Sequence, residues 1–188
     1  MTRFFDSMDE IERFSSELRY QSSSLTCKQC SSQRDFVSHG YVYRQLSINN
    51  RIKVGKRIIC SNRFGRNGCG FSFRCLLNTR IPRLKYSAIE VFTFILMLLS
   101  KLSVKNSYQK ATGAQSERQG WRWSNRLKQS QSFYRSVISS SFRKNGLKTS
   151  CHRTPLLDCL QGLVQCFPKR NSCAVIQQLT QTAVFLTV

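Results

Sequence analysis

The sequence has few carboxylates, and most of them lie at one end. Lys and Arg total 30 residues against nine Asp and Glu, which gives a formal net charge of +21 over 188 residues. Five of the nine carboxylates precede residue 19. A chain with this imbalance repels itself unless a polyanion neutralises it. We therefore expect DNA or RNA as the partner, in preference to an acidic membrane surface.

Long apolar runs and a secretory leader are also missing. The longest uncharged apolar stretch, residues 91–99, is about half as long as a bilayer-spanning helix. The first residues lack a basic start followed by an apolar core and a small-residue cleavage site. The nine cysteines are an odd number without the regular spacing of a disulfide framework. These features predict a cytoplasmic protein with no membrane association, whose cysteines are reduced.

Two cysteine pairs carry the strongest chemical signal. Cys27 and Cys30 are separated by two residues, and Cys60 and Cys69 by eight. A structural Zn2+ takes four thiolates that arrive as pairs from short loops. We therefore predict Zn2+ as the cofactor, with these four cysteines as its ligands. The insert at 61–68 is then a loop between two ligands, rich in Arg and Gly.

Other readings of the cysteines and histidines stay open. Cys75 is a possible substitute ligand, although a buried free thiol is the simpler interpretation. His39 is a further alternative ligand. The first pair could instead be a redox dithiol, but this function favours a helix directly after the pair, and Ser-rich sequence surrounds it. The last four cysteines have helical spacing, which favours core packing over a second metal site; they are Cys151, Cys159, Cys166 and Cys173.

The hydrophobic pattern predicts an α+β protein built from four segments. Residues 1–22 predict an acidic amphipathic helix whose acidic face is either solvated or shields the basic remainder. Residues 23–84 predict a small zinc-ribbon β module. Residues 85–142 predict an all-α helix-turn-helix bundle. Residues 143–188 predict a basic linker and C-terminal helices, which could form a homodimer or dock a catalytic subunit.

Within the ribbon, strands are expected around residues 41–43, 57–59 and 71–73, where β-branched and aromatic residues alternate between turn signals. In this arrangement Cys60 ends one strand and Cys69 precedes the next. The basic residues Lys53, Lys56 and Arg57 of the ribbon are expected to contact phosphates, as are Arg63 and Arg66 of the inserted loop.

Three helices are expected after residue 85. An apolar helix spans 86–102, a second begins after Ser103 and ends at Gly113, and a third begins at Ser116 with a capping box completed by Gln119. The third is expected to continue toward residue 141. Two helices joined by a short Gly-containing turn have the layout of a helix-turn-helix, which bundles that bind no DNA share.

The third helix carries the candidate DNA-reading face. Trp121 and Trp123 lie about 200° apart around the helix, so only one of them can enter the core. Gly120 predicts a close approach of another part of the chain. Side chains that can contact base edges lie opposite Trp123 and Leu127; they are Arg118, Arg122, Asn125, Arg126 and Gln129.

The run from Cys60 to Phe73, followed by Ile81-Pro-Arg-Leu, Ala111-Thr-Gly and Trp121-Arg-Trp-Ser-Asn-Arg-Leu, resembles bacterial insertion-element proteins of the transposase type. The resemblance covers about residues 24–138. It implies a zinc ribbon before a helix-turn-helix, and DNA binding at element ends or at a promoter. Full transposases of the acidic-triad type also carry three metal-binding carboxylates, whereas residues after 85 offer only Glu90, Glu117 and Asp158.

The prediction is therefore a zinc-dependent protein of a mobile element that binds double-stranded DNA and is accessory or regulatory, without catalysis of its own. A catalytic transposase subunit would be a partner. The alternative is an RNA-binding or ribosome-associated zinc-ribbon protein, for which the same charge and aromatic residues would serve.

Overall fold

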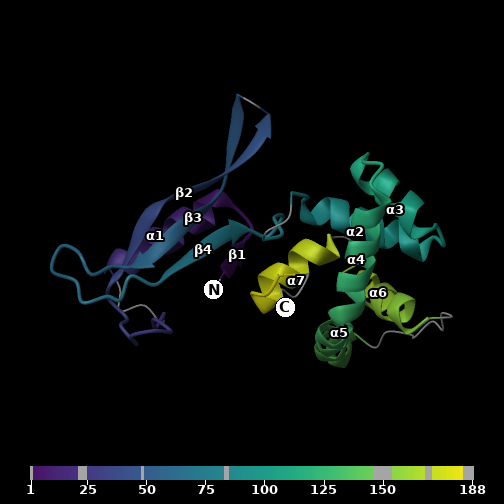
Figure 1. The fold of residues 1–188 in the computed structure, drawn as a ribbon. Coiled ribbons are helices and arrows are strands. Elements are labelled where there is room, and N and C mark those ends of the chain that lie inside the picture. The colour runs from purple at the N-terminus through teal and green to yellow at the C-terminus, as the bar shows by residue number, and fades with distance from the viewer. Residues whose placement is uncertain are drawn as a thin grey trace. The chain divides into compact units, whose positions relative to one another are not determined.

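The computed structural model describes residues 2–20, 25–47, 49–82, 85–145, 154–167 and 171–183. The chain divides into two compact units, residues 1–78 and 79–188. This division differs from the four predicted segments, because the N-terminal helix belongs to the first unit and the C-terminal helices to the second. Both units are drawn in Figure 1.

The first unit is a four-stranded sheet with a helix packed on it. The strands are β1 (Thr2–Phe5), β2 (Phe36–Ser47), β3 (Asn50–Cys60) and β4 (Ser72–Leu77), in the spatial order β1-β4-β3-β2. The pairs β2–β3 and β3–β4 are antiparallel, while β1 pairs in parallel with β4. The strands expected at 41–43 and 57–59 lie within β2 and β3, and the one expected at 71–73 overlaps the start of β4, but β1 was not predicted.

Helix α1 (Met8–Tyr20) covers the sheet, as its amphipathic pattern predicts. Ile11 and Leu18 from the helix meet Phe36, Ile58 and Phe73 from the strands in one buried cluster. The rings of Phe36 and Phe73 pack edge to face at 5.8 Å. This core fixes the ends of β3 and β4, between which the inserted loop departs.

Among its described residues, the second unit is built from helices, with one isolated β-bridge between Arg80 and Ser87. Its helices are α2 (Ala88–Leu99), α3 (Val104–Thr112), α4 (Glu117–Gln129), α5 (Gln131–Asn145), α6 (Pro155–Cys166) and α7 (Ser172–Thr180). Trp123 lies at its centre, fully buried, with the rings of Tyr86, Phe94 and Tyr108 edge to face around it at 5.1–5.4 Å. These perpendicular contacts are the favoured geometry of aromatic pairs.

Several predicted helix ends are confirmed, and others are wrong. The Ser103 side chain accepts a hydrogen bond from the backbone N–H of Asn106, and Gly113 ends α3 in the left-handed conformation. Ser116 precedes α4 but makes no capping hydrogen bond with its side chain, so the predicted capping box is wrong there. The single helix expected from residue 116 to 141 is divided at Ser130 into α4 and α5.

The C-terminal helices belong to the same core as Trp123. Leu160, Leu163 and Ile176 are buried in that cluster, and the Gln177 side chain donates to the carbonyl of Arg80 at 2.9 Å. These side chains are therefore not free to form a dimer interface. Most of the basic linker expected from residue 143 lies outside the described residues, and so does Cys151. None of the helices described is both long and apolar enough to cross a membrane.

Candidate metal centre and nucleic-acid surface

Four cysteines that are distant in sequence converge at one end of the sheet unit. The sulfur atoms of Cys27, Cys30, Cys60 and Cys69 all lie within 4.8 Å of one another. Cys60 is the last residue of β3, and Cys69 lies just before β4, so the sheet register sets the second pair. The four thiols predicted from spacing are thus brought together, and they could hold a metal ion.

The two cysteine loops are built alike despite their different lengths. In the first, the Cys27 N–H donates to the carbonyl of Ser32 at 2.8 Å, and the Ser31 N–H donates to Cys27 at 2.9 Å. In the second, the Cys60 N–H donates to Phe71 at 2.8 Å, and the Gly70 N–H donates to Cys60 at 2.7 Å. In each loop the residue after the second cysteine has a positive φ, 59° at Ser31 and 81° at Gly70.

The eight-residue insert is a loop added between the two cysteines, and it leaves their shared hydrogen-bond pattern unchanged. The Gly68 N–H donates to the carbonyl of Ser61 at 2.9 Å, which brings the two ends of the insert together beside Cys60 and Cys69. A Cβ on Gly68 would lie 2.4 Å from the Ser61 oxygen, so only glycine fits this approach. The pinch explains how a spacing of eight residues serves the same geometry as a spacing of two.

The sulfur separations fit a tetrahedral metal better than disulfides. The Cys27–Cys69 and Cys30–Cys60 sulfur distances are both 3.6 Å. Sulfurs bound to zinc at about 2.3 Å lie about 3.8 Å apart in a tetrahedron. A disulfide requires about 2.05 Å, and all four cysteines are free thiols. The arrangement therefore matches four separate donors around one ion.

The electrostatics of the cluster differ from thiol to thiol. Burial opposes ionisation of Cys27, but the backbone N–H groups of Gln29 and Cys30 stabilise its thiolate and lower its pKa to about 7. Burial, together with the neighbouring thiols Cys30 and Cys27, raises the pKa of Cys60 to about 12. Four thiols this close cannot all ionise without a cation among them, because like charges oppose one another.

The other candidate ligands lie outside the cluster. Cys75 is fully buried in β4, and its burial raises the pKa of the thiol to about 12, which confirms the interpretation as a free core thiol. His39 is exposed on β2 and is not part of the sulfur cluster. Cys159, Cys166 and Cys173 are buried in the helical unit, as their spacing predicts. The first pair is followed by β2 and not by a helix, which removes the structural basis of the redox alternative.

The basic residues of the sheet unit fall into two groups. Lys53, Arg57 and Arg63 are exposed, and Arg66 is half-buried because its guanidinium donates to the carbonyl of Arg34 at 2.8 Å. Lys56 differs from the prediction, because its ammonium is largely buried and pairs with Glu12 of α1 at 2.5 Å. Lys56 therefore holds α1 on the sheet and is not free to contact phosphate. The same ion pair shows that the acidic helix packs on the basic sheet.

All five predicted reading residues share one exposed face of α4. Arg118, Arg122, Asn125, Arg126 and Gln129 are solvent-exposed, opposite the buried Trp123 and Leu127. Trp121 is 53% exposed, so the prediction that only one Trp enters the core is confirmed. A Cβ on Gly120 would lie 2.9 Å from the Tyr108 Cβ, which shows the close approach of α3 that this glycine predicts.

A group of exposed aromatic side chains on the sheet unit was not predicted as functional. Tyr41 and Tyr43 lie on β2, where the Lys53 ammonium sits 4.2 Å from the Tyr41 ring centre. Phe64, at the tip of the inserted loop, is 98% exposed. The available sequence signal was that Phe64 is the one apolar side chain in an insert otherwise made of Ser, Asn, Arg and Gly.

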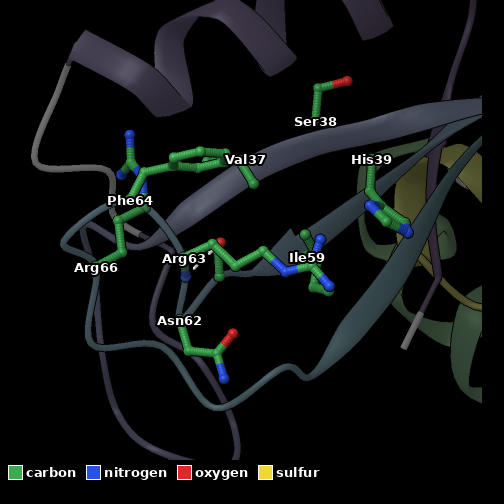
Figure 2. Close-up of a pocket in the computed structure, with 9 residues that line it drawn as sticks. Val37, Ser38, His39, Ile59, Asn62, Arg63, Phe64 and Arg66 are labelled. Carbon is green, nitrogen blue, oxygen red and sulfur yellow. Dashed lines mark hydrogen bonds between the residues drawn. The ribbon is translucent and has the colours of Figure 1, made fainter.

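Next to Phe64 lies a pocket of about 800 Å³. Figure 2 shows its lining, with the Arg63 side chain extended toward Ile59 and His39 at the opposite end. Between Asp35 and Glu90 the sequence has no carboxylate but contains eleven Lys and Arg residues. The pocket and its loop therefore lie in a long basic stretch of the chain that has no carboxylate.

Comparisons of the chain with protein-family models, curated proteins and solved structures found no match.

Proposed function

We propose that this chain is a zinc-dependent DNA-binding protein, in which the four-cysteine cluster holds Zn2+ and the exposed face of α4 reads duplex DNA. The observation that carries the proposal is the convergence of four thiols from two loops of matching hydrogen-bond pattern, with all sulfurs within 4.8 Å of one another and two pairs at 3.6 Å. Four sulfur ligands suit zinc or iron among the common metals. With all four positions of a tetrahedral ion filled by protein, the metal is structural and not catalytic.

The duplex-reading role belongs to the helical unit. Helices α3 and α4 pack together and are joined by the four residues 113–116, the layout of a helix-turn-helix. Arg pairs with guanine, and Asn or Gln with adenine, in the major groove. Arg122 and Asn125 sit on the outward face of α4 with no core role to explain them.

The resemblance to insertion-element proteins supports a more specific version of this proposal. The chain would act as an accessory or regulatory protein of a mobile element in the cytoplasm, with a separate subunit for catalysis. Terminal inverted repeats or a transposase reading frame beside the gene would support it. Their absence from several independent copies of the gene would count against it.

The DNA-binding proposal is tested by titrating the zinc-loaded protein with duplex DNA and with structured RNA over a range of salt concentrations. We expect preferential duplex binding, with log affinity falling by about 0.9 per log unit of salt for each phosphate contacted. Arg122→Ala should weaken duplex binding. Arg135→Ala is the matched control, since it removes one exposed charge from α5.

A preference for structured RNA would favour the RNA-binding alternative, and an affinity that does not change with salt would reject both. Equal effects of Arg122→Ala and Arg135→Ala would remove α4 as the reading face. Elemental analysis of the purified protein separately tests the metal, with one zinc per chain as the expected result.

A further inference from the structure

The exposed phenylalanine of the inserted loop does not pack in the core of the protein. The Phe64 side chain is 98% exposed and belongs to neither hydrophobic core. Its backbone has a φ of +57°, a left-handed conformation that is unfavourable for a bulky residue. Phe64 and Gly65, at +74°, have the positive φ angles of a type I′ turn, closed by the Arg66 N–H on the Arg63 carbonyl at 3.3 Å. This turn favours Asn, Asp or Gly at the first central position.

The loop that carries the ring is held in place. Besides the Gly68–Ser61 pinch, the Arg63 N–H donates to the Ser61 hydroxyl at 3.1 Å, and the Arg66 guanidinium reaches the carbonyl of Arg34. The loop begins and ends at Cys60 and Cys69 of the metal cluster. An unfavourable residue conformation on an anchored loop points to a functional constraint on the ring.

The pocket beside the ring has the size and polarity to accept one nucleotide. Its volume of about 800 Å³ is within the range of small-ligand sites. Arg63, His39 and Asn62 contribute polar groups, and no carboxylate lines it. Figure 2 shows the Arg63 guanidinium reaching across the pocket. No partner of the Arg63 side chain is found in the described part of the chain, so it is free to bind a phosphate.

We propose that Phe64 and this pocket bind an unpaired nucleotide, with the base stacked on the Phe64 ring and the phosphate held by Arg63. This inference rests on the proposed nucleic-acid-binding function and adds a single-stranded site to it. Bases inside a duplex are stacked on both faces and cannot reach the ring, whereas an unpaired base has a free π-face. The positive charge of residues 36–89, which include no carboxylate between Asp35 and Glu90, also supports a nucleotide as the ligand. An acidic peptide would match the charge but would need specific contacts as well.

The test is fluorescence anisotropy of the zinc-loaded full chain with labelled oligothymidylate, oligouridylate and a DNA duplex. Phe64→Ala should weaken binding of the single strands by about 5-fold to 150-fold, the range for losing one stacked base. Duplex binding should not change. Phe64→Trp should retain single-strand affinity, and its added fluorescence should be quenched by the strand. Leu179→Ala, which removes an exposed apolar side chain from the helical unit, is the matched control.

Comparison of the two single strands tells whether DNA or RNA supplies the nucleotide. Single-strand binding by Phe64→Ala equal to that of the wild type would overturn the inference while leaving duplex binding intact. Absence of binding to every oligonucleotide would reject the proposed function as well. The zinc content of each variant, measured in parallel, shows whether the cysteine loops are preserved. Loss of single-strand affinity in Phe64→Ala and not in Phe64→Trp assigns the effect to the aromatic ring.

Discussion

Replacing Cys30 with Ser should remove the metal from the sheet unit and destabilise that unit alone. Cys30 is exposed, and a substitution at such a position normally changes the free energy of unfolding by no more than about 0.5 kcal/mol. A larger loss therefore reports the missing ligand and not missing core packing. Cys75→Ala is the matched control, because Cys75 is buried in β4 outside the cluster.

The expected loss follows from the binding energy of four-cysteine sites. Structural zinc in small modules binds with an apparent free energy of about 10 kcal/mol or more, which is a dissociation constant of about 50 nM or lower. At about 1,000 times that concentration of free zinc, binding adds about 4 kcal/mol to the folded state. In a domain below 100 residues, this lowers the unfolding midpoint by about 15–30 °C when the ligand is lost.

The chain offers a built-in reporter for the assay. Both Trp residues, Trp121 and Trp123, lie in the helical unit, so Trp fluorescence follows that unit while calorimetry reports both. Cys30→Ser should lower the transition of the sheet unit and leave the Trp transition in place. Cys75→Ala should keep one zinc per chain. Equal zinc contents in the two variants, or a sheet transition in Cys30→Ser that matches the wild type at saturating zinc, would refute the assignment.

Three further substitutions test other contacts. Glu12→Gln should lower the free energy of unfolding by about 1 kcal/mol at neutral pH, since it leaves the Lys56 ammonium largely buried without its carboxylate. The hydrogen bond from Lys56 lowers the pKa of Glu12, so the ion pair stabilises the fold at pH values above the usual pKa of Glu. Urea titrations should therefore show the difference between variant and wild type vanishing as pH falls through the lowered pKa. Gly120→Val should destabilise the helical unit by about 1–3 kcal/mol, because even a Cβ there lies 2.9 Å from the Tyr108 Cβ; Trp fluorescence should detect it, with zinc content unchanged. Phe64→Asn should stabilise the sheet unit by up to about 1 kcal/mol in calorimetry while weakening single-strand binding, because Asn tolerates the left-handed conformation. The first prediction would be contradicted if Glu12→Gln and the wild type were equally stable at all pH values. The second would be contradicted if Gly120→Val left the Trp transition unshifted, and the third if Phe64→Asn were less stable than the wild type.

Local signals in the sequence predicted the parts of the structure that depend on nearby residues. The spacing of the cysteines predicted the four thiols that converge, and the Ser103 and Gly113 signals predicted both ends of α3. Helical periodicity predicted that only one of Trp121 and Trp123 enters the core, and Trp123 is the one that does. The α+β class followed from the change of period near residue 85.

The features that were missed depend on contacts between distant segments. Strand β1 has four residues and no alternation of its own, and it exists because β4, about 70 residues later, offers a free edge. The pairing of Lys56 with Glu12 joins residues 44 positions apart, so no local pattern separated Lys56 from its exposed neighbours. The break at Ser130 lies in sequence that would support one continuous helix, and only packing of α5 against α6 distinguishes the two helices.

The parallel pairing of β1 with β4 bears on the order in which the sheet unit assembles. Without a cross-link, closing this pair costs the entropy of a loop of roughly 70 residues, whereas the hairpin of β2 and β3 closes locally. A metal that first joins Cys27 to Cys69 shortens the remaining loop to roughly 25 residues and lowers its closure cost by about 1 kcal/mol. Early metal binding would then bring β1 and β4 closer along the chain. Pairing of β1 with the sheet should be several-fold faster when zinc is present from the start of refolding than when it is added at the end.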